Sequence, residues 1–566
     1  MLPDKLEPAD LRDEVIGVDS TIETPFGERL MVYCDYTASG RSLHFVERYL
    51  QSLLQTYANT HTEDDVTGRS TSFLLHEAER AIKRAVNAGP GGRIVACGTG
   101  ATGAIDKFQQ LLGVAIAPAT RDFVERSLEQ FLGSERAAEF AHYRQGRQPV
   151  VFVGPYEHHS NEISWRLGYA TVVPVDLASD GGMDLAHLER LLQEPAYQGR
   201  LRIGSFSAAS NVTGMRTPVS EIAAMLHRHD ALACFDYAAS GPYVGIDMNP
   251  GDDAWLDAIF VSPHKFLGGP GSSGVLVFNE RLYHRELPPS VAGGGTVDYV
   301  SPEDQDFIED IEEREKAGTP GILQTLRAAL AFEVKRAVTP AAIEAREAEL
   351  LGRAFARWTG AEGIEILGNP DPSRRIGIVS FNVRDPRGSY LHPKFVTALL
   401  NDLFGIQSRA GCSCAGPYGH RLLGIGPDVS EQYRAWVRKG YHGIKPGWCR
   451  VGFHFTMDDT EAGYLIEAVR FVARAGHRFL PLYGFDARSG AWRHRDARDP
   501  EPAFTLEEAL RAAPAGKGAL PESARARAYA HYLAEAERLS ADLADDAPAR
   551  TASPSTDFGA LQFFST

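Results

Sequence analysis

Short apolar runs alternate with segments of helical spacing between residues 93 and 278, and this alternation restricts the possible folds more than any other feature. The runs that we expect to form strands cover residues 93–97, 149–153, 171–175, 201–205, 234–236, 258–261 and 274–278. Strands that alternate with helices predict an α/β fold, with a largely parallel sheet and helices on both faces. In such sheets ligands bind beyond the carboxyl ends of the strands, so the residues after each run are the first candidates for a site.

A lysine stands between the last two runs, in the order Ser262-Pro263-His264-Lys265, and glycines follow it. An amine held between two buried strands is partly desolvated and can act as a nucleophile, which suggests a Schiff-base lysine. A solvated lysine in a surface turn is the commoner interpretation of an isolated segment of this kind. Asp236 favours the Schiff-base interpretation, because it stands at a strand end one strand and loop before the lysine. Pyridoxal 5′-phosphate (PLP) needs both residue types, an acid as partner for its ring nitrogen and an amine that forms the imine.

A glycine-rich turn, Gly98-Thr99-Gly100-Ala101-Thr102-Gly103, follows the first run and opens a helical segment. Glycines let the backbone approach an anion, and the free amides at a helix N-terminus hold a phosphate. A dinucleotide fingerprint is the rival interpretation of such a turn. Because no Schiff-base lysine belongs to that rival, we favour the PLP phosphate.

Together these residues resemble the class V aminotransferase family and, within it, the group of cysteine desulfurases and selenocysteine lyases. The resemblance extends over roughly residues 30–475. It implies PLP fold type I, in which a large domain with a mostly parallel, seven-stranded type of sheet is followed by a smaller α+β domain. The cofactor-binding residues that it implies are Lys265, Asp236, His158, Gly100, Ala101, Thr102, Asn211, Ser262, His264 and Thr319.

The resemblance also implies roles for several of these residues. Lys265 holds the cofactor and removes the α-proton after the substrate has exchanged onto it. Asp236 keeps the ring nitrogen charged, and the imidazole of His158 stacks on the ring and moves protons. Thr319 reaches the cofactor phosphate of the other subunit, which implies a homodimer. From the sequence alone, His158 could equally be a loop histidine and Asn211 a turn or capping residue.

The segment from Ser408 to Pro417 resembles the active-site loop of group II desulfurases, and its register puts the persulfide-forming nucleophile at Cys414. Cysteine attacks as the thiolate, which a nearby cation favours, and Arg409 is the nearest candidate. Arg450 matches the family arginine that pairs with the substrate carboxylate. Arg409 and Asn211 are the other candidates for substrate binding.

The cysteines of this region could also serve two different purposes. Cys412, Cys414, His420 and Cys449 offer ligands for a metal, although one residue between two cysteines is not the usual zinc spacing. They could instead be ordinary buried cysteines, and we predict no metal site. Cys412 falls where the group often has another residue type, so it either resolves the persulfide or has no role.

Several features depart from the resembled family, and after about residue 480 the resemblance stops. Ala239 stands where glutamine or histidine is common, so the usual hydrogen bond to the ring oxygen of the cofactor is missing or comes from elsewhere. Residues 418–447 are much longer than their counterpart and could cover the pocket or exclude a sulfur acceptor. Residues 118–147 form a charged, helical insertion that the resembled enzymes largely lack, and we assign it no function.

Composition excludes several classes of function. A net charge of −16 with no basic stripe argues against nucleic acid as a partner. The N-terminus lacks a secretory pattern, and no run approaches the roughly 18 apolar residues of a membrane helix, so we expect a soluble, cytoplasmic protein. Six cysteines in 566 residues are too few for a disulfide scaffold.

The expected organisation is an N-terminal lead-in over residues 1–30 that ends in a small hairpin, a large PLP-binding domain over 31–320, a small α+β domain over 321–480, a helical extension over 481–545 and a disordered tail over 546–566. The extension should hold helices at residues 505–512 and 522–543, and apolar residues that recur at three and four predict an amphipathic helix over residues 73–86. The expected function is that of a PLP-dependent cysteine desulfurase, which takes sulfur from L-cysteine and leaves alanine and a persulfide on Cys414. A protein that accepts the sulfur is a possible partner. The alternatives are another class V reaction, such as transamination, C–S lysis or epimerisation, or a catalytically silent binding protein.

Overall fold

The computed structural model describes residues 6–60, 62, 64–251, 253–498, 520–543 and 555–565. It divides into two compact units. Unit 1 consists chiefly of Thr37–Ala345 with Arg374–Ile376, and unit 2 takes Glu7–Tyr36, Arg346–Ser373 and the described part of Gly377–Thr566. This division differs from the expected one, because the N-terminal segment belongs to unit 2 and the boundary near residue 320 lies after residue 345.

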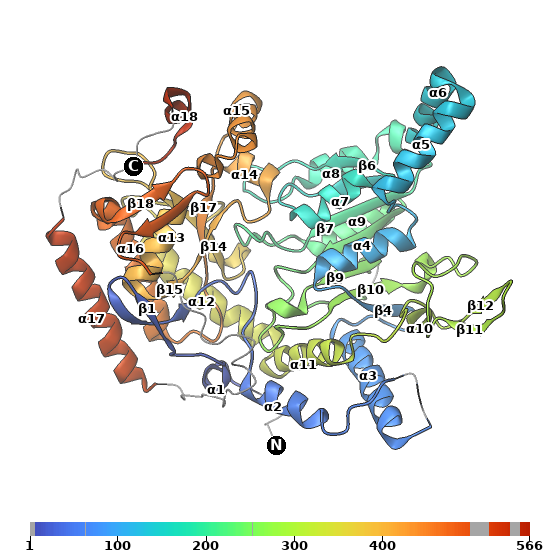
Figure 1. The fold of residues 1–566 in the computed structure, drawn as a ribbon, viewed down its shortest axis with the longest axis horizontal. Coiled ribbons are helices and arrows are strands. Elements are labelled where there is room, and N and C mark those ends of the chain that lie inside the picture. Colours follow the sequence, from blue (N-terminus) through green and yellow to red (C-terminus); the bar gives the residue numbers. More distant parts are fainter. Residues whose placement is uncertain are drawn as a thin grey trace. The chain divides into compact units, whose positions relative to one another are not determined.

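A seven-stranded sheet forms the centre of unit 1 (Figure 1). In order across the sheet, the strands are β4 (Gly92–Cys97), β10 (Gly274–Asn279), β9 (Ala258–Val261), β8 (Ala231–Asp236), β7 (Arg202–Ser207), β5 (Val150–Val153) and β6 (Thr171–Pro174). All neighbours are parallel except β10, which is antiparallel to both β4 and β9. The predicted mostly parallel sheet is therefore confirmed, and every run that we expected to be a strand forms one.

Helices cover this sheet because the strands are apolar on both faces. Strands β5 and β9 are buried at every position, as expected of parallel strands between two helical layers. Helix α4 (Ala101–Leu111) packs on β9 and β10, with the rings of Phe108 and Phe260 5.5 Å apart. Helix α9 (Val219–Arg228) packs on β8, and α3 (Val66–Ala85) packs along α11 (Ile322–Val338).

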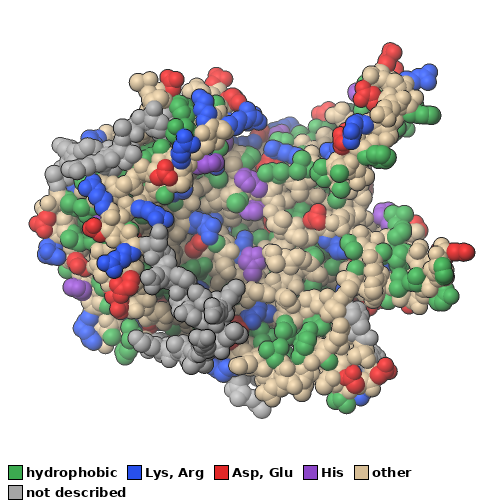
Figure 2. Space-filling view, viewed as in Figure 1, with side chains coloured by type: hydrophobic (Ala, Val, Ile, Leu, Met, Phe, Trp, Pro, Cys, Tyr) green, Lys and Arg blue, Asp and Glu red, His purple; other side chains and the backbone are tan. Residues whose placement is uncertain are grey.

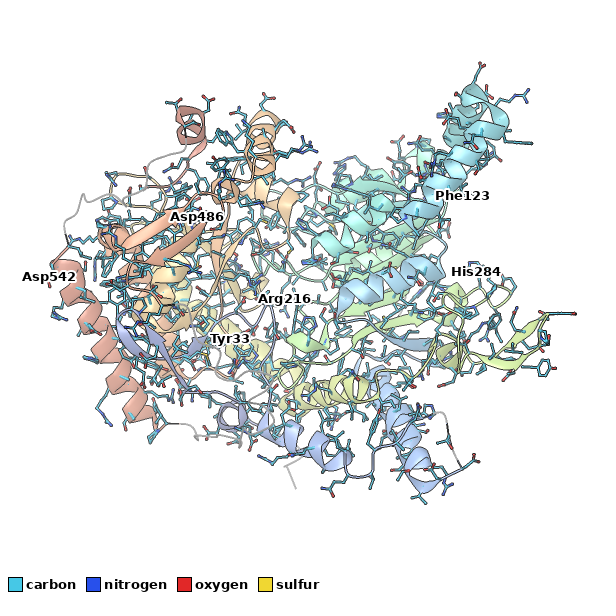
Figure 3. All side chains as sticks on the ribbon, in the orientation of Figure 1. Tyr33, Phe123, Arg216, His284, Asp486 and Asp542 are labelled. Carbon is cyan, nitrogen blue, oxygen red and sulfur yellow. The ribbon has the colours of Figure 1, made fainter. Side chains whose placement is uncertain are left out.

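The insertion at residues 118–147 is helical, as predicted. Helices α5 (Pro118–Leu132) and α6 (Ser134–Gln145) are joined at Gly133 and extend away from the sheet (Figure 1). Neither helix has a single buried residue. Hydrophobic side chains therefore lie on its surface (Figure 2), among them Phe123, which is 67% exposed (Figure 3), and Phe131, which is 87% exposed.

Unit 2 is an α+β unit built on a four-stranded antiparallel sheet. Its strands, in order, are β13 (Ile364–Ile366), β14 (Ile378–Val383), β17 (Trp448–Gly452) and β16 (Arg409–Gly411). Helices α13 (Pro393–Phe404) and α16 (Asp459–Ala475) contribute to its apolar core. Trp358 lies in that core with its ring 5.7 Å from Phe381 and 5.6 Å from Phe453.

The start of the chain belongs to unit 2 because of strand pairing. Strands β1 (Thr21–Thr24) and β2 (Gly27–Leu30) form the predicted small hairpin. The next strand, β3 (Val32–Tyr33), pairs in parallel with β15 (Ile406–Gln407). Helix α1 (Pro8–Glu14) is joined to the same unit by Arg12, whose guanidinium lies 2.7 Å from Asp19.

The C-terminal region contains more structure than we expected. Helix α17 (Glu522–Ala541) forms where a helix was predicted, whereas the other predicted helix, at residues 505–512, lies outside the described residues. Residues 555–565 lie in the segment expected to be a disordered tail, yet they hold α18 (Thr556–Leu561). Phe564 is only 4% exposed, and its ring lies 4.4 Å from that of His392, so an aromatic anchor holds this end. Among the described residues, no helix is long and apolar enough to cross a membrane.

Candidate functional site

A pocket opens in unit 1 around the residues that follow β4, β5, β7, β8 and β9. It is lined by Thr99, Gly100, Ala101, Thr102, His158, Ser160, Ser207, Ala209, Asn211, Asp236, Ala238, Ala239, Ser262, His264 and Lys265. Every predicted cofactor-binding residue except Thr319 is in this set. The structure therefore brings together, from five separate strand ends, residues that lie tens of positions apart in the sequence.

Lys265 ends a short 3₁₀ turn, Pro263–Lys265, in the connection between β9 and β10. Because these two strands are hydrogen-bonded neighbours, both ends of this connection are fixed. The loop is also clamped from outside, where the backbone amide of Gly40 donates to the His264 carbonyl at 2.8 Å. A Cβ atom at Gly40 would stand 2.0 Å from the Phe266 carbonyl oxygen, so this approach requires glycine.

Asp236 is the last residue of β8, and its side chain is buried. The backbone amide of Ala238 donates to Oδ1 at 2.8 Å. Burial raises the pKa of the Asp236 carboxyl, while the Ala238 amide and the charge of Lys265 act in the opposite direction. A buried carboxylate of this kind is suited to a protonated ring nitrogen, since such a partner supplies the missing positive charge.

The glycine-rich turn forms a cradle at the N-terminus of α4. Gly100 caps the helix with a φ of +117°, a conformation that side chains rarely adopt. A Cβ atom there would lie 2.8 Å from His264 Cε1, so this glycine also leaves room for its neighbours. The Ala101 amide donates to Ser262 Oγ at 2.8 Å, and the hydroxyls of Thr102 and Ser160 are 2.6 Å apart. Amides at a helix start with hydroxyls around them form an anion site.

The protonation states of two further lining residues, His158 and His264, follow from their surroundings. The Ser160 amide donates to Nδ1 of His158 at 3.2 Å, so the neutral imidazole carries its proton on Nε2. Burial, with a smaller contribution from the charge of Lys265, lowers the pKa of His264 to about 4. His264 is therefore neutral at pH 7. Asn211 lies buried in the loop after β7, on the wall of the same pocket.

The predicted substrate arginines lie in unit 2, where both bind one carboxylate. Arg409 on β16 and Arg450 on β17 face each other in the strand register. Arg409 Nη2 lies 2.8 Å from Asp35 Oδ2, and Arg450 Nη2 lies 3.1 Å from Asp35 Oδ1. The sequence did not indicate this role for Asp35, because it follows β3 and is more than 370 positions away from either arginine.

The cysteine loop of unit 2 contains a tight turn. Cys412 and Cys414 are exposed, and the Ala415 amide donates to the Cys412 carbonyl at 3.0 Å. Ser413 and Cys414 have φ values of 51° and 57°, which is left-handed backbone for two consecutive non-glycine residues. Trp448 Nε1 donates to Ser413 Oγ at 3.2 Å and fixes the turn to β17.

Comparison with known proteins matches residues 136–465 to the model of the aminotransferase class-V family. The chain belongs to the class-V aminotransferase family. Sequence relatives of this class-V protein include probable cysteine desulfurases of Halalkalibacterium halodurans, 31% identical over 50% of this chain and 65% of the relative, and of Staphylococcus aureus strain Mu50, 26% identical over 72% and 88%. The matched stretch thus spans just under two thirds of the first relative.

Solved structures support the same fold for this class-V aminotransferase-family protein. The apo cysteine desulfurase of Thermococcus onnurineus NA1 superimposes with a TM-score of 0.61 at 20% identity, covering 83% of this chain and 98% of that one. The cysteine desulfurase CsdA of Escherichia coli gives 0.60 at 19% identity, covering 82% and 98%. The predicted PLP fold type I is therefore confirmed.

One predicted cofactor residue of this family member lies outside the pocket lining. Thr319 Oγ1 accepts a hydrogen bond from Asn59 Nδ2 at 3.0 Å, in unit 1. The role predicted for Thr319 is in the pocket of a second subunit. Its position outside the pocket of its own chain does not test that role, which stays a prediction.

Glu157 is a buried residue of the site that the sequence pattern did not single out. Its Oε1 accepts from the backbone amides of Gly154 and Ser207, and its Oε2 from the Ser207 hydroxyl and Asn161 Nδ2. Burial is the main cause that raises the pKa of this carboxyl to about 7. Since Ser207 lines the pocket, Glu157 positions the pocket wall from behind. The available signal was an acidic residue directly before the histidine pair and shortly after an apolar strand.

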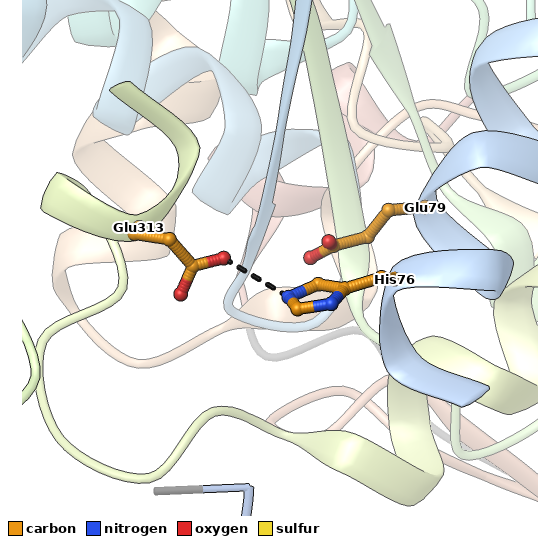
Figure 4. Close-up of side chains that lie close together, drawn as sticks. All are labelled: His76, Glu79 and Glu313. Atoms are coloured by element: carbon orange, nitrogen blue, oxygen red, sulfur yellow. Dashed lines mark hydrogen bonds and ion pairs between the residues drawn. The ribbon is translucent and has the colours of Figure 1, made fainter. Parts of the chain in front are cut away.

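The four residues considered as a metal site do not form one. Within the described ranges, the only group of three or more His, Cys, Asp or Glu side chains with ligand atoms within 4.8 Å of one another is His76, Glu79 and Glu313 (Figure 4). Lys316 Nζ already lies 2.7 Å from Glu79 and 2.8 Å from Glu313, so an ammonium group supplies the positive charge there. Cys449 is instead buried beside Thr397 and Ser408, and burial raises the pKa of its thiol to about 11.

Proposed function

We propose that this class-V aminotransferase-family protein is a PLP-dependent cysteine desulfurase, which converts L-cysteine to alanine and leaves the sulfur as a persulfide on Cys414. The observation that carries the proposal is the meeting of Lys265, Asp236 and the Gly100 cradle in one pocket. Relatives named as probable cysteine desulfurases support it.

The pocket residues fit PLP in three respects. Lys265 offers an amine for the aldehyde, buried Asp236 offers a carboxylate for the pyridine nitrogen, and the start of α4 offers amides for the phosphate. The room left by the missing Cβ of Gly100 is part of this fit. When bound, PLP supplies an electron sink for charge that develops on the substrate Cα.

Protein groups then perform the remaining tasks. Lys265 Nζ, once free of its covalent link, is the base that takes the proton from the substrate Cα. Asp236 would hold a proton on the ring nitrogen of the bound cofactor, and His158, which carries its own proton on Nε2, lines the same pocket. Arg450 and Arg409 bind the substrate carboxylate, for which Asp35 is the resident competitor.

Cys414 completes the reaction. Its thiolate attacks the sulfur of the substrate, so that an S–S bond forms while the C–S bond breaks. The electron pair of the broken bond stays on the carbon, which takes up a proton and becomes the methyl group of alanine. The persulfide on Cys414 must then lose its outer sulfur before the next turnover. We further infer a homodimer, in which Thr319 serves the site of the partner.

Two substitutions test this function. Lys265→Ala should abolish the visible absorbance of protein-bound PLP and the formation of alanine, whereas Lys439→Ala, an exposed lysine, should change neither. Cys414→Ala should keep the absorbance but form no persulfide from L-cysteine. Persulfide formation by Cys414→Ala at the parental rate, or a keto acid product in place of alanine, would refute the assignment.

A further inference from the structure

The turn at residues 412–415 places two thiols on one small loop. Its carbonyl-to-amide hydrogen bond joins the first and fourth residues, and its two central residues both have positive φ. These are the features of a type I′ turn, with Cys412 at the first position and Cys414 at the third. Two residues of fully extended chain span at most about 7 Å, and left-handed backbone shortens that span, so the Cα atoms of Cys412 and Cys414 come within the spacing that a disulfide spans.

The conformation of this turn is held from outside. Left-handed backbone is disfavoured for side chains other than glycine, and Ser413 and Cys414 both adopt it. The indole of buried Trp448 binds the Ser413 hydroxyl at 3.2 Å. Strain that the surrounding structure maintains is found at functional positions.

The remaining cysteines are not available for chemistry at the surface. Cys34, Cys234 and Cys449 are buried, and Cys97 is partly so, whereas Cys412 and Cys414 are exposed. Burial raises the pKa of each of these four buried or partly buried cysteines, which keeps their side chains as thiols. Cys412 and Cys414, which are two residues apart, are therefore the two accessible thiols that can react with each other.

We propose that Cys412 resolves the persulfide on Cys414, so that this protein releases its sulfur as hydrosulfide and ends the turnover as a Cys412–Cys414 disulfide. This inference rests on the proposed function. Cys412 loses its thiol proton to solvent, and its thiolate attacks Sγ of Cys414. The Sγ–Sγ bond forms, the bond to the outer sulfur breaks, and the outer sulfur leaves with that electron pair as HS⁻.

The cycle closes through an external reductant of the thiol class. Two thiol equivalents, or one dithiol, reduce the disulfide and restore Cys412 and Cys414. A ring closed between residues two apart is sterically restricted and exposed, and such disulfides are readily reduced. With no thiol beyond one equivalent of the substrate, the protein should therefore complete one turnover and stop.

A single-turnover experiment tests this directly. PLP-loaded full-length protein, with reductant removed, is mixed with one equivalent of L-cysteine per chain, because excess L-cysteine is itself a thiol that would reduce the disulfide, and released sulfide is measured over time. The expected yield is about one sulfide per chain. Trypsin should then release residues 410–421, a peptide with both cysteines and no internal Lys or Arg, lighter by two hydrogen atoms than its reduced form.

Variants separate the resolving role from a structural one. Cys412→Ser should retain the persulfide on Cys414, visible as one extra sulfur on the same peptide, and release sulfide at least tenfold more slowly. Lys439→Ala is the control, because this exposed lysine lies outside the turn and its loss leaves both thiols and the Ser413 contact with Trp448 in place. It should behave as the parent.

Each remaining outcome decides the question. Sulfide release by Cys412→Ser at the parental rate, or a lasting persulfide on Cys414 of the parent, would overturn the role of Cys412 and leave the proposed function standing. Absence of added sulfur on Cys414 in every variant would overturn the proposed function and this role with it. Oxidation of the parent by diamide should also give the internal disulfide, and its failure to do so would refute the pairing regardless of the substrate.

Discussion

Glu157→Gln tests the structure of the pocket wall without depending on any cofactor. In the parent, Oε2 of the carboxyl accepts from the Ser207 hydroxyl and, at 2.8 Å, from Asn161 Nδ2, so it meets two donors. A glutamine keeps one oxygen for the amides of Gly154 and Ser207, but it turns an NH₂ group toward Asn161. Two donors then face each other.

Asn161 cannot rotate to relieve this conflict. Its Oδ1 already accepts from Trp165 Nε1 at 3.2 Å and from Ser205 Oγ at 2.6 Å, so a flipped amide would break both bonds. One buried donor is left without an acceptor, which costs about 1–3 kcal/mol. We therefore expect Glu157→Gln to lower the free energy of unfolding by about that amount at pH 6.

The size of this loss should depend on pH. The folded protein holds the Glu157 proton with a pKa of about 7, above the ordinary 4.5, so between these values it binds more protons than the unfolded chain. The parent therefore loses stability as the pH rises through this window, by at most about 3 kcal/mol from this group, at 1.36 kcal/mol per pKa unit. Glutamine does not titrate, so the gap between parent and variant should shrink between pH 6 and pH 8.5.

Urea unfolding at several pH values measures both effects. Trp165 is a local fluorescence probe, since its indole binds Asn161 directly. Glu139→Gln, an exposed acid on α6, is the matched control and should change stability by less than about 0.5 kcal/mol. A Glu157→Gln variant as stable as the parent at pH 6, or a gap that does not vary with pH, would refute this hydrogen-bond network.

Three further substitutions give independent tests. Gly100→Ala should raise the dissociation constant of PLP about tenfold, because a Cβ atom meets His264 in backbone that disfavours side chains by about 1–2 kcal/mol; unchanged titration by absorbance would contradict this. Asp35→Asn should lower the KM for L-cysteine about fivefold, because it removes a competing ion pair of about 1 kcal/mol from the two arginines; an equal or higher KM counts against it. Phe564→Ala should destabilise unit 2 by about 3 kcal/mol, seen as a lower Tm, whereas a truly mobile tail would show no change.

The sequence predicted the sheet well because its strands are buried on both faces. A run such as that of β5 or β9 has few alternative interpretations once turn residues flank it. The same runs located Lys265 and Asp236 at strand ends, and the topology of a parallel sheet then brought them to one edge. Local pattern and topology were sufficient for the centre of the pocket.

Long-range pairing could not be predicted in this way. The partners of Asp35 and β3 lie more than 370 positions away, and no local pattern records them. The start of α3 at Val66, seven residues before the predicted one, depends on the cap that Asp65 supplies through the Gly68 amide at 2.7 Å. The ordered end at Phe564 depends on an aromatic cluster that only the folded unit presents.

The division of the chain also governs the order in which it can mature. Unit 1 is nearly continuous, so its sheet is complete once Asn279 has left the ribosome, and the whole unit once Ile376 has. Unit 2 needs segments from both ends, and Arg525 of α17 lies 3.4 Å from Asp19 near the first helix. The earliest residues to be synthesised must therefore wait for nearly the last. A nascent chain stalled after residue 376 would hold a complete unit 1 while β3 still lacks its partner strand β15.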